Sequence, residues 1–392
     1  MSDTLYLAWR YMRYNRGKTA ILVASLALLL YIPMGLQLLV DRTAARLRTR
    51  ADTTPVIIGD KGSSLDLVLR ALYFEGEVPA AIPYAQVTRI AATGLADAIP
   101  IHARFAVRQQ PVVGTTIDYF RFRGLATERG GLFTGLGECV LGAAAAEALD
   151  AGPGDKVVTS PENLFDLAGS YPLRMRVTGV LSRSHSPDDD AVFVDIKTAW
   201  VIAGLGHGHR DLAEKGAEGQ VLERDGNRIT ANASVVQFNE ITPQNLGSFH
   251  FHGDRSALPV TAVIALPHDD KSRTLLLGRY LGRDEPCQIE EPSAVMNEVI
   301  ATVVRVRGYV IAVALLLGCG TLLTICLVFL LSIRLRRREL ATMEKIGCSR
   351  SLVAALVGSE AAIVFVVALA LALLLALLTA WGGESLIRGL IV

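Results

Sequence analysis

Histidines are the residues of this sequence whose type and spacing best suit metal binding. Four of its seven histidines form two His-x-His pairs, namely His207, His209, His250 and His252. Alternate residues of a strand point to the same side, so a pair could offer two imidazole nitrogens to one zinc or copper ion, and Asp254 could add an oxygen. The competing interpretation buries Phe249 and Phe251 and leaves the histidines as ordinary outward polar residues. Both interpretations stay open.

Other patterns argue against an enzyme. Residues Gly59–Ser64 contain Gly, Lys and Ser, but not at the spacing of a phosphate-binding loop, and predict a tight turn. The acidic run Asp188–Asp190 follows a Ser-Pro pair and is more typical of a solvated turn than of a cation site. The sequence holds no HExxH or GxSxG motif and no recognisable pair of catalytic carboxylates. We therefore expect no catalytic residue in this chain, and its net charge of +1 without a basic, aromatic stripe indicates no nucleic-acid partner.

Three apolar segments dominate the elements that must position these residues. The sequence is 51% hydrophobic with a mean hydropathy of +0.38, and the excess lies in residues 19–40, 308–332 and 352–381. None of the three contains Lys or Arg. Each has at least the about 20 residues that a helix needs to cross a bilayer. We therefore predict an α-helical membrane protein with three spans. Glu360, the one acid in these segments, should pair with a neighbour, face water or lie near the interface.

Basic residues near the spans predict their orientation. Ten lie before the first span or between the second and third: Arg10, Arg13, Arg16, Lys18, Arg334, Arg336, Arg337, Arg338, Lys345 and Arg350. Six lie on the opposite side: Arg42, Arg46, Arg48, Arg50, Arg305 and Arg307. This bias places the N-terminus in the cytoplasm and residues 41–304 outside it.

Residues 41–304 are predicted to form a large extracytoplasmic α+β domain of two lobes. Helical patterns cover 65–74, 142–149 and 271–281. Strand patterns cover 104–108, 110–114, 174–181, 191–194 and 259–266, and Asp-Gly within 222–229 signals a hairpin. We expect at least one βαβ-like part. Cys139 and Cys287 lie in this domain, either as a disulfide or, more plainly, as two unpaired buried thiols.

The shorter segments complete the predicted layout. Residues 1–18 mix aromatic, apolar and basic residues, which favours an interfacial helix or an ordinary cytoplasmic lead-in, and residues 382–392 form a short tail. Residues 334–350 (RLRRRELATMEKIGCSR) form a basic, amphipathic stretch in which Leu340, Met343 and Ile346 recur every third residue. A short cytoplasmic helix of this kind can dock in the groove of a partner protein.

That stretch resembles the loop after the second span in the MacB/FtsX/LolC family of ABC permeases. The matching pattern is R-x-R-R-R-E-L-A-x-M-x-x-I-G-x-S-R. Residues 8–10 and 16–19 resemble the start of the family's first helix. Further pieces resemble its external domain in the right order: 113–115, 119–120, 131–133, 140–142, 154–157, 177–180 and 191–194. The resemblance therefore extends across nearly the whole chain.

The resemblance implies a homodimer or a permease heterodimer bound to two cytoplasmic ATPase subunits. It implies ATPase-coupling roles for six residues: Arg338, Glu339, Leu340, Met343, Ile346 and Gly347. The first two would contact the partner at the rim, the next three would form the apolar face, and the glycine would allow a turn. The family usually has four spans, so this chain is either a three-span branch or a shortened sequence.

We therefore expect a multi-pass permease subunit of the bacterial inner membrane, with lipid contacts, no cofactor of its own and a periplasmic adaptor as a further partner. Its separate ATPase would drive export or extraction of a substrate at the outer side. One alternative is a non-transporting regulator that relays ATPase motion to an external partner. Another is a membrane-anchored metal-binding sensor.

Overall fold

The computed structural model describes residues 2–160, 172–208, 221–225, 228–231, 238–251 and 253–391. The chain has two compact units, which we call the helical unit (Met1–Leu47 and Glu298–Val392) and the globular unit (Arg48–Asn297). Helices α2 (Arg16–Asp52) and α9 (Pro292–Leu335) each contribute residues to both units. The predicted domain limit at 41 thus falls inside α2 and the limit at 304 inside α9. Both helices extend beyond the apolar segments from which the limits were predicted.

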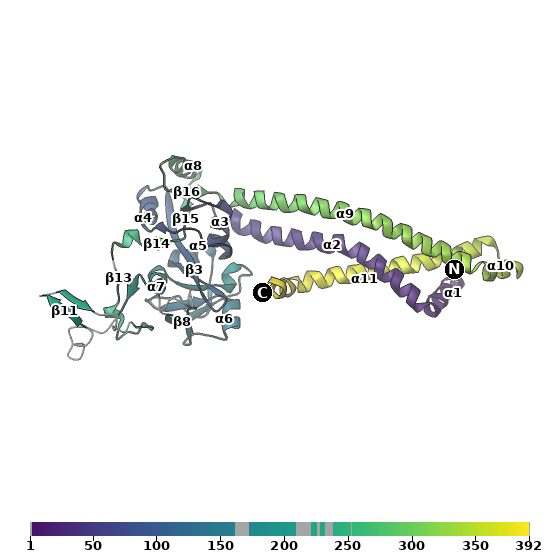
Figure 1. Cartoon of the computed structure of the whole chain (residues 1–392), viewed down its shortest axis with the longest axis horizontal. Coiled ribbons are helices and arrows are strands. Elements are labelled where there is room, and N and C mark those ends of the chain that lie inside the picture. The colour runs from purple at the N-terminus through teal and green to yellow at the C-terminus, as the bar shows by residue number, and fades with distance from the viewer. Residues whose placement is uncertain are drawn as a thin grey trace. The chain divides into compact units, whose positions relative to one another are not determined.

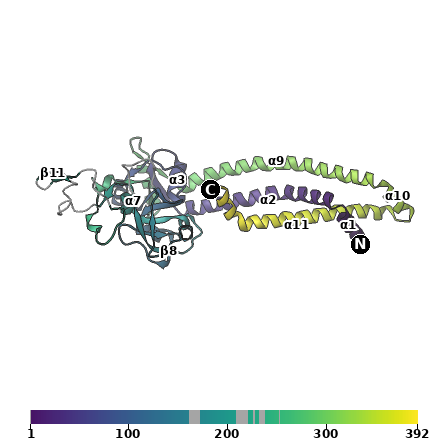
Figure 2. The ribbon, with the colours of Figure 1, turned by 60° about the horizontal axis from the view of Figure 1, so that its bottom comes forward.

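Three helices of the helical unit are long and apolar enough to cross a membrane: α2, α9 and α11 (Arg350–Ile391). The predicted segments 19–40, 308–332 and 352–381 lie within them. Helix α11 continues through the predicted tail as far as Ile391, since no proline interrupts it. A short helix, α10 (Arg337–Lys345), lies between α9 and α11 (Figure 2).

The N-terminal helix α1 (Ser2–Tyr14) packs against α11 (Figure 2). Its Met12 is buried in a cluster with Leu22 of α2 and Val364 of α11. Trp9 and Tyr14 are exposed. One face of α1 therefore contacts the other helices, and the exposed aromatic rings lie on a different face. That α1 lies in the lipid headgroup layer stays a prediction.

A ten-stranded sheet organises the globular unit. The strand order is β16-β1-β15-β3-β4-β9-β6-β8-β5, and β7 pairs with β8. These strands are β1 (Val56–Asp60), β3 (Ala96–Val107), β4 (Gln110–Thr115), β5 (Thr127–Gly130), β6 (Glu138–Leu141), β7 (Lys156–Val158), β8 (Arg174–Leu181), β9 (Val192–Asp195), β15 (Ala262–Pro267) and β16 (Cys287–Glu290). Three further pairs are β2 (Ile82–Pro83) with β14 (Pro259–Val260), β10 (Gly206–His207) with β13 (His250–Phe251), and β11 (Val221–Asp225) with β12 (Arg228–Ala231).

Short helices connect and cover these strands. The α-helices are α3 (Ser64–Tyr73), α4 (Ala85–Ala92), α5 (Ile117–Arg123), α6 (Ala143–Leu149), α7 (Ile196–Ile202) and α8 (Asp270–Arg279). The described residues also form the 3₁₀-helices η1 (Pro187–Asp190), η3 (Leu246–Ser248) and η4 (Arg255–Ala257). Polar side chains cap the N-termini of two of these helices. Ser63 accepts a hydrogen bond from the first turn of α3, and Asp269 accepts one from the first turn of α8.

The predicted βαβ-like part is present. Strands β6 and β8 are parallel with α6 between them in sequence, which makes a βαβ unit, and β4 and β9 are also parallel. The predicted hairpin is formed by the antiparallel strands β11 and β12. The predicted strand 259–266 is divided at Thr261, which has β14 before it and β15 after it.

Two hydrophobic clusters share the continuous sheet. One contains residues of β6, β8 and α6, and the other contains residues of β15, α4 and α8. Figure 1 shows α4 and α8 near β15 and β16, and α6 near β8. The described residues of the globular unit thus contain two clusters along one sheet, and its division into two lobes stays a prediction.

The two cysteines of the globular unit are unpaired. Cys139 lies in the cluster with α6 and Cys287 in the cluster with α8. Burial raises the pKa of the Cys139 thiol to about 12 and that of the Cys287 thiol to about 11. The plainer prediction of two buried thiols is thus confirmed.

Candidate coupling site

An exposed apolar side chain directly follows the C-terminal end of α10. Ile346, directly after the helix, is 79% exposed, Met343 is half-buried and Arg338 is exposed. Glu339 and Leu340 belong to α10, but their side chains lie outside the described part of the chain. The helix is shorter than the predicted 334–350, because Arg334 and Leu335 end α9 and residues 346–349 form a turn.

The Gly-Cys-Ser sequence after Ile346 ends α10 and leads into α11. Gly347 has a φ of 105°, which side chains rarely tolerate, and the Cys348 N–H donates to the Met343 carbonyl at 3.0 Å. This six-to-one bond is typical of a Schellman helix end. Ser349 then accepts a hydrogen bond on its Oγ from the Leu352 N–H at 3.3 Å, at the start of α11. Glycine is required here by the backbone angle, since no atom lies within 4 Å of the position a Cβ would take.

An ion pair lies at the other end of α10. Arg336, between α9 and α10, places Nη1 2.9 Å from Oε1 of Glu360 in α11. Its guanidinium carbon lies 3.6 Å from the ring centroid of Tyr11 in α1, close enough for a cation–π contact. Both charged side chains are largely buried. Of the alternatives for Glu360, pairing with a neighbour is therefore confirmed.

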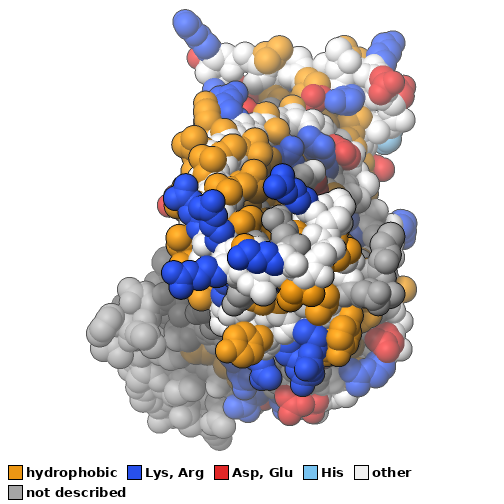
Figure 3. Space-filling view, turned by 90° about the vertical axis from the view of Figure 1, so that its right-hand side faces the viewer, with side chains coloured by type: hydrophobic (Ala, Val, Ile, Leu, Met, Phe, Trp, Pro, Cys, Tyr) orange, Lys and Arg blue, Asp and Glu red, His pale blue; other side chains and the backbone are white. Residues whose placement is uncertain are grey.

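Exposed basic side chains surround these elements. They are Arg10, Arg13, Arg16, Arg334, Arg337, Arg338, Lys345 and Arg350. Figure 3 views the molecule from the side that carries α1 and α10 and shows Lys and Arg side chains among hydrophobic ones. Such a surface suits anionic lipid headgroups or the charged rim of a protein groove.

A buried charge cluster fixes the end of α2 in the globular unit. Arg50 donates from Nη1 to Oδ2 of Asp188 at 2.7 Å and from Nη2 to Oδ1 at 2.8 Å. The Tyr119 hydroxyl accepts from Arg50 and donates to Asp188, each at 2.7 Å. Arg50 also donates from Nε to the Leu72 carbonyl. Burial alone would raise the pKa of Asp188, but the charge and hydrogen bonds of Arg50 outweigh it and the pKa is lowered.

The acidic run 188–190 is therefore not the predicted solvated turn. Asp188 and Asp189 are buried. Asp189 accepts hydrogen bonds from the backbone N–H groups of Ser184 and His185 at 2.8 Å each. The run lies in η1, and its first two carboxylates hold together segments of the globular unit.

The family model of the MacB-like periplasmic core domain matches residues 19–239, more than half of the chain. The chain belongs to the MacB/FtsX-type family of ABC transporter permeases. The permease is similar to the periplasmic region of MacB from Actinobacillus actinomycetemcomitans, with 12% identity, a TM-score of 0.35 and coverage of 64% of this chain and 97% of that one. It is also similar to the extracellular domain of the noncanonic ABC-type transporter YknZ from Gram-positive bacteria, with 12% identity, a TM-score of 0.32 and coverage of 60% and 98%. No curated protein matches the sequence.

Two of the permease's predicted metal ligands lie side by side. His207 of β10 and His250 of β13 are direct partners in the antiparallel register, with ring centroids 4.9 Å apart. His209 and His252 lie outside the described residues. Asp254 instead caps η4 with its carboxylate. The described part of the chain contains no group of three His, Cys, Asp or Glu residues that could hold a metal.

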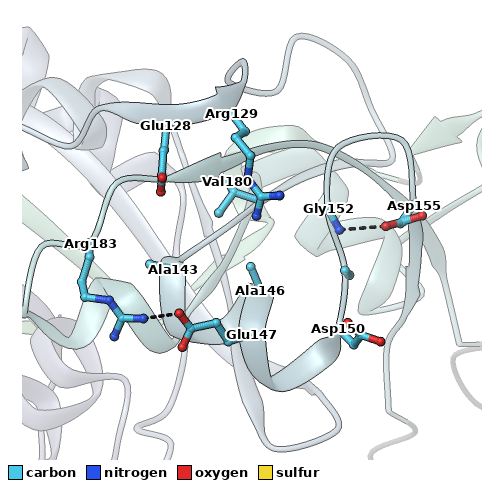
Figure 4. A pocket seen from close by; sticks show the side chains of 11 residues that line it. Glu128, Arg129, Ala143, Ala146, Glu147, Asp150, Gly152, Asp155, Val180 and Arg183 are labelled. Atoms are coloured by element: carbon cyan, nitrogen blue, oxygen red, sulfur yellow. Dashed lines mark hydrogen bonds and ion pairs between the residues drawn. The ribbon is translucent and has the colours of Figure 1, made fainter.

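A charged cavity of about 640 Å³ lies elsewhere in the permease's globular unit (Figure 4). Its charged lining residues are Glu128, Arg129, Glu147, Asp150, Asp155 and Arg183. Arg183 donates to Glu147 across it. The remaining lining residues are glycine, alanines and one valine, so the cavity lacks the large apolar walls typical of small-molecule sites.

Sequence reasoning missed two arginines of the permease that organise its helix ends. Arg336 stands in a run of four arginines within five residues, which gives no sign of which one is buried. The signal in the sequence was Glu360. An acid within an apolar helix is energetically costly, so it indicated that a basic partner lies nearby. Arg50 gave no comparable signal, since Asp188 lies 138 residues further along the chain.

Proposed function

We propose that this permease is the membrane subunit of a mechanotransmission-type ABC system and that a separate cytoplasmic ATPase binds α10. Ile346 carries this proposal, because a large apolar side chain with 79% exposure directly after a basic helix suits the groove of a protein partner. Arg338 would contact the rim of that groove. The family, whose members are permease components and not enzymes, supports the division of labour between two subunits.

The basic residues near α1 and α10 favour a cytoplasmic position for both helices. The globular unit would then lie in the periplasm and the chain would cross the bacterial inner membrane several times. We expect two copies, identical or different, to bind two ATPase subunits. A periplasmic adaptor is a further partner in this proposal.

Continuous helices support a mechanical role. Helices α2 and α9 each run without interruption from an apolar stretch into residues of the globular unit. ATP-driven closure of the ATPase subunits would displace α10, and the helices would carry the displacement to the periplasm. There the globular unit would act on a substrate to be exported or extracted.

Replacing Ile346 with Asp tests the docking site. We expect Ile346→Asp to abolish co-purification of the ATPase from the native host, because it places a charge in the apolar contact, and Met343→Asp to weaken it. The matched control is Ala341→Asp, an exposed position of α10 about 160° around the helix from Met343. Equal recovery of the ATPase with Ile346→Asp and Ala341→Asp would refute docking through this face.

A further inference from the structure

We propose that His207 and His250 form a two-histidine site for a borderline divalent ion of the Zn²⁺ type, which joins strands β10 and β13. The proposal stands apart from the coupling function, since it concerns only the globular unit. It begins from the register, which pairs His207 directly with His250 and Gly206 with Phe251. Directly opposed residues of an antiparallel pair extend to the same face of the sheet with their Cβ atoms about 5 Å apart.

The ring geometry is compatible with a shared ion. The centroids are 4.9 Å apart and the ring planes meet at 67°. Two nitrogens bound to one tetrahedral zinc at about 2.0 Å each lie about 3.3 Å from one another. Since each nitrogen lies about 1 Å from its ring centroid and the terminal torsion of histidine is soft, ring rotation alone can bring two nitrogens to that spacing.

A second contact sets the tautomer of one ligand. Nδ1 of His250 lies 3.0 Å from the Ser248 carbonyl oxygen. A carbonyl only accepts hydrogen bonds, so Nδ1 carries the proton and Nε2 carries the lone pair that a metal needs. Metal-ligating histidines commonly have their other nitrogen oriented in this way by a backbone carbonyl.

Aromatic packing holds both strands in place. A Cβ on Gly206 would lie 2.6 Å from the Phe251 ring, and a Cβ on Gly208 would lie 2.6 Å from the Phe249 ring. Phe251 packs against both hydrophobic clusters and Phe249 against the one that contains α6. The phenylalanines therefore anchor one face, and alternation sends the two imidazoles to the other. The two initial interpretations of these histidines thus describe opposite faces of the same strands.

The bound ion would link two strands that are distant in the sequence. In sequence, residues 207 and 250 stand on either side of the β11–β12 hairpin, so an ion bound to both would tie together the flanking strands β10 and β13. Imidazole nitrogen favours zinc, copper or nickel over magnesium, which prefers oxygen ligands. Water molecules would complete the coordination.

Zinc titration of the full-length permease, purified in detergent without a polyhistidine tag, tests the site. Isothermal titration with ZnCl₂ should show one ion per chain, and His207→Ala or His250→Ala should each weaken binding about tenfold or more. Zinc should also raise the melting temperature of the wild type but of neither variant. His268→Ala, an exposed histidine of the same unit, is the matched control and should bind as the wild type does. MgCl₂ should give no binding. Zinc affinity that survives in both variants, or falls equally in the control, overturns the proposal, and ATPase co-purification should be unchanged in every variant.

Discussion

At the residue scale, His102 is one of the buried titratable groups that the coupling site does not use. It lies in β3 opposite Gly114, next to the Phe105 ring at 5.7 Å. Among the described residues neither of its ring nitrogens has a hydrogen-bond partner. Burial, with a smaller effect of Arg104, lowers its pKa to about 4.

This low pKa predicts a pH-dependent stability. Between pH 6.5 and 4 the unfolded chain binds a proton on His102 and the folded chain does not, so acid favours unfolding. From pH 7.5 to pH 5 the loss should be about 2 kcal/mol from this residue. Melting temperatures at the two pH values should therefore differ less in His102→Leu than in the wild type. An exposed histidine serves as the control: His268→Gln should keep the full difference, and an unchanged difference in His102→Leu would contradict the prediction.

Single residues show where sequence reasoning ends. The His-x-His spacing predicted shared faces, but only the strand register could pair His207 with His250. Asp188 was predicted to lie in a solvated turn because its neighbours in the sequence are polar. Its actual partner, Arg50, is 138 residues distant, and local spacing carries no information about such a contact.

At the scale of elements, patterns in the sequence located three of the six α-helices described in the globular unit, namely α3, α6 and α8, and about half of its described strands. The predicted strand 174–181 is β8, and the predicted helix 142–149 differs from α6 by one residue. The predicted helix 334–350 was too long because its first two residues end α9 and because the backbone turns at Gly347, directly after the last residue of the apolar pattern, Ile346. A positive φ cannot be inferred from periodicity, although a glycine at a helix end is a signal of it.

The turn after α10 yields a prediction of its own. Gly347→Ala should destabilise the turn by about 1–2 kcal/mol, because an alanine at a φ of 105° is strained. Hydrogen exchange of residues 346–353 should then be about tenfold faster, and ATPase co-purification should fall. Gly358→Ala is a matched control, since Gly358 lies inside α11 with open space around its Cβ position, and it should be neutral or stabilising. Equal exchange in the two variants would show that the turn does not depend on its glycine.

At the scale of the whole molecule, the sequence predicted the three apolar helices and the α+β character of the globular unit. It did not predict that the helices continue beyond their apolar stretches, since the hydropathy signal ends where the charged residues begin. Arg42, Arg48 and Arg50 follow the first apolar stretch, yet α2 extends to Asp52. That extension brings Arg50, in the last turn of a helix that contains a candidate span, into the buried cluster with Asp188 and Tyr119.

Under the proposed mechanical role, this cluster would be the point at which force enters the globular unit. A buried, bidentate pair resists displacement more than an apolar contact does, because separating the charges leaves both without compensation in a low dielectric. Asp188→Asn should destabilise the globular unit by about 3 kcal/mol or more, as expected when one partner of a buried pair is removed. The double variant Arg50→Met/Asp188→Leu removes both charges and should be more stable than Asp188→Asn, since its main remaining cost is the loss of the two hydrogen bonds of the Tyr119 hydroxyl.

The double variant therefore separates coupling from folding. In the assembled complex we expect it to hydrolyse ATP normally but to lose most of the nucleotide-dependent change in hydrogen exchange around α3 and η1, whose positions depend on Arg50. Arg183→Met/Glu147→Leu removes an exposed ion pair of the same unit and should leave that change intact. If the double variant at Arg50 and Asp188 retains the full nucleotide response, the force must enter through another element, and α9, the second helix shared by both units, is the next to test.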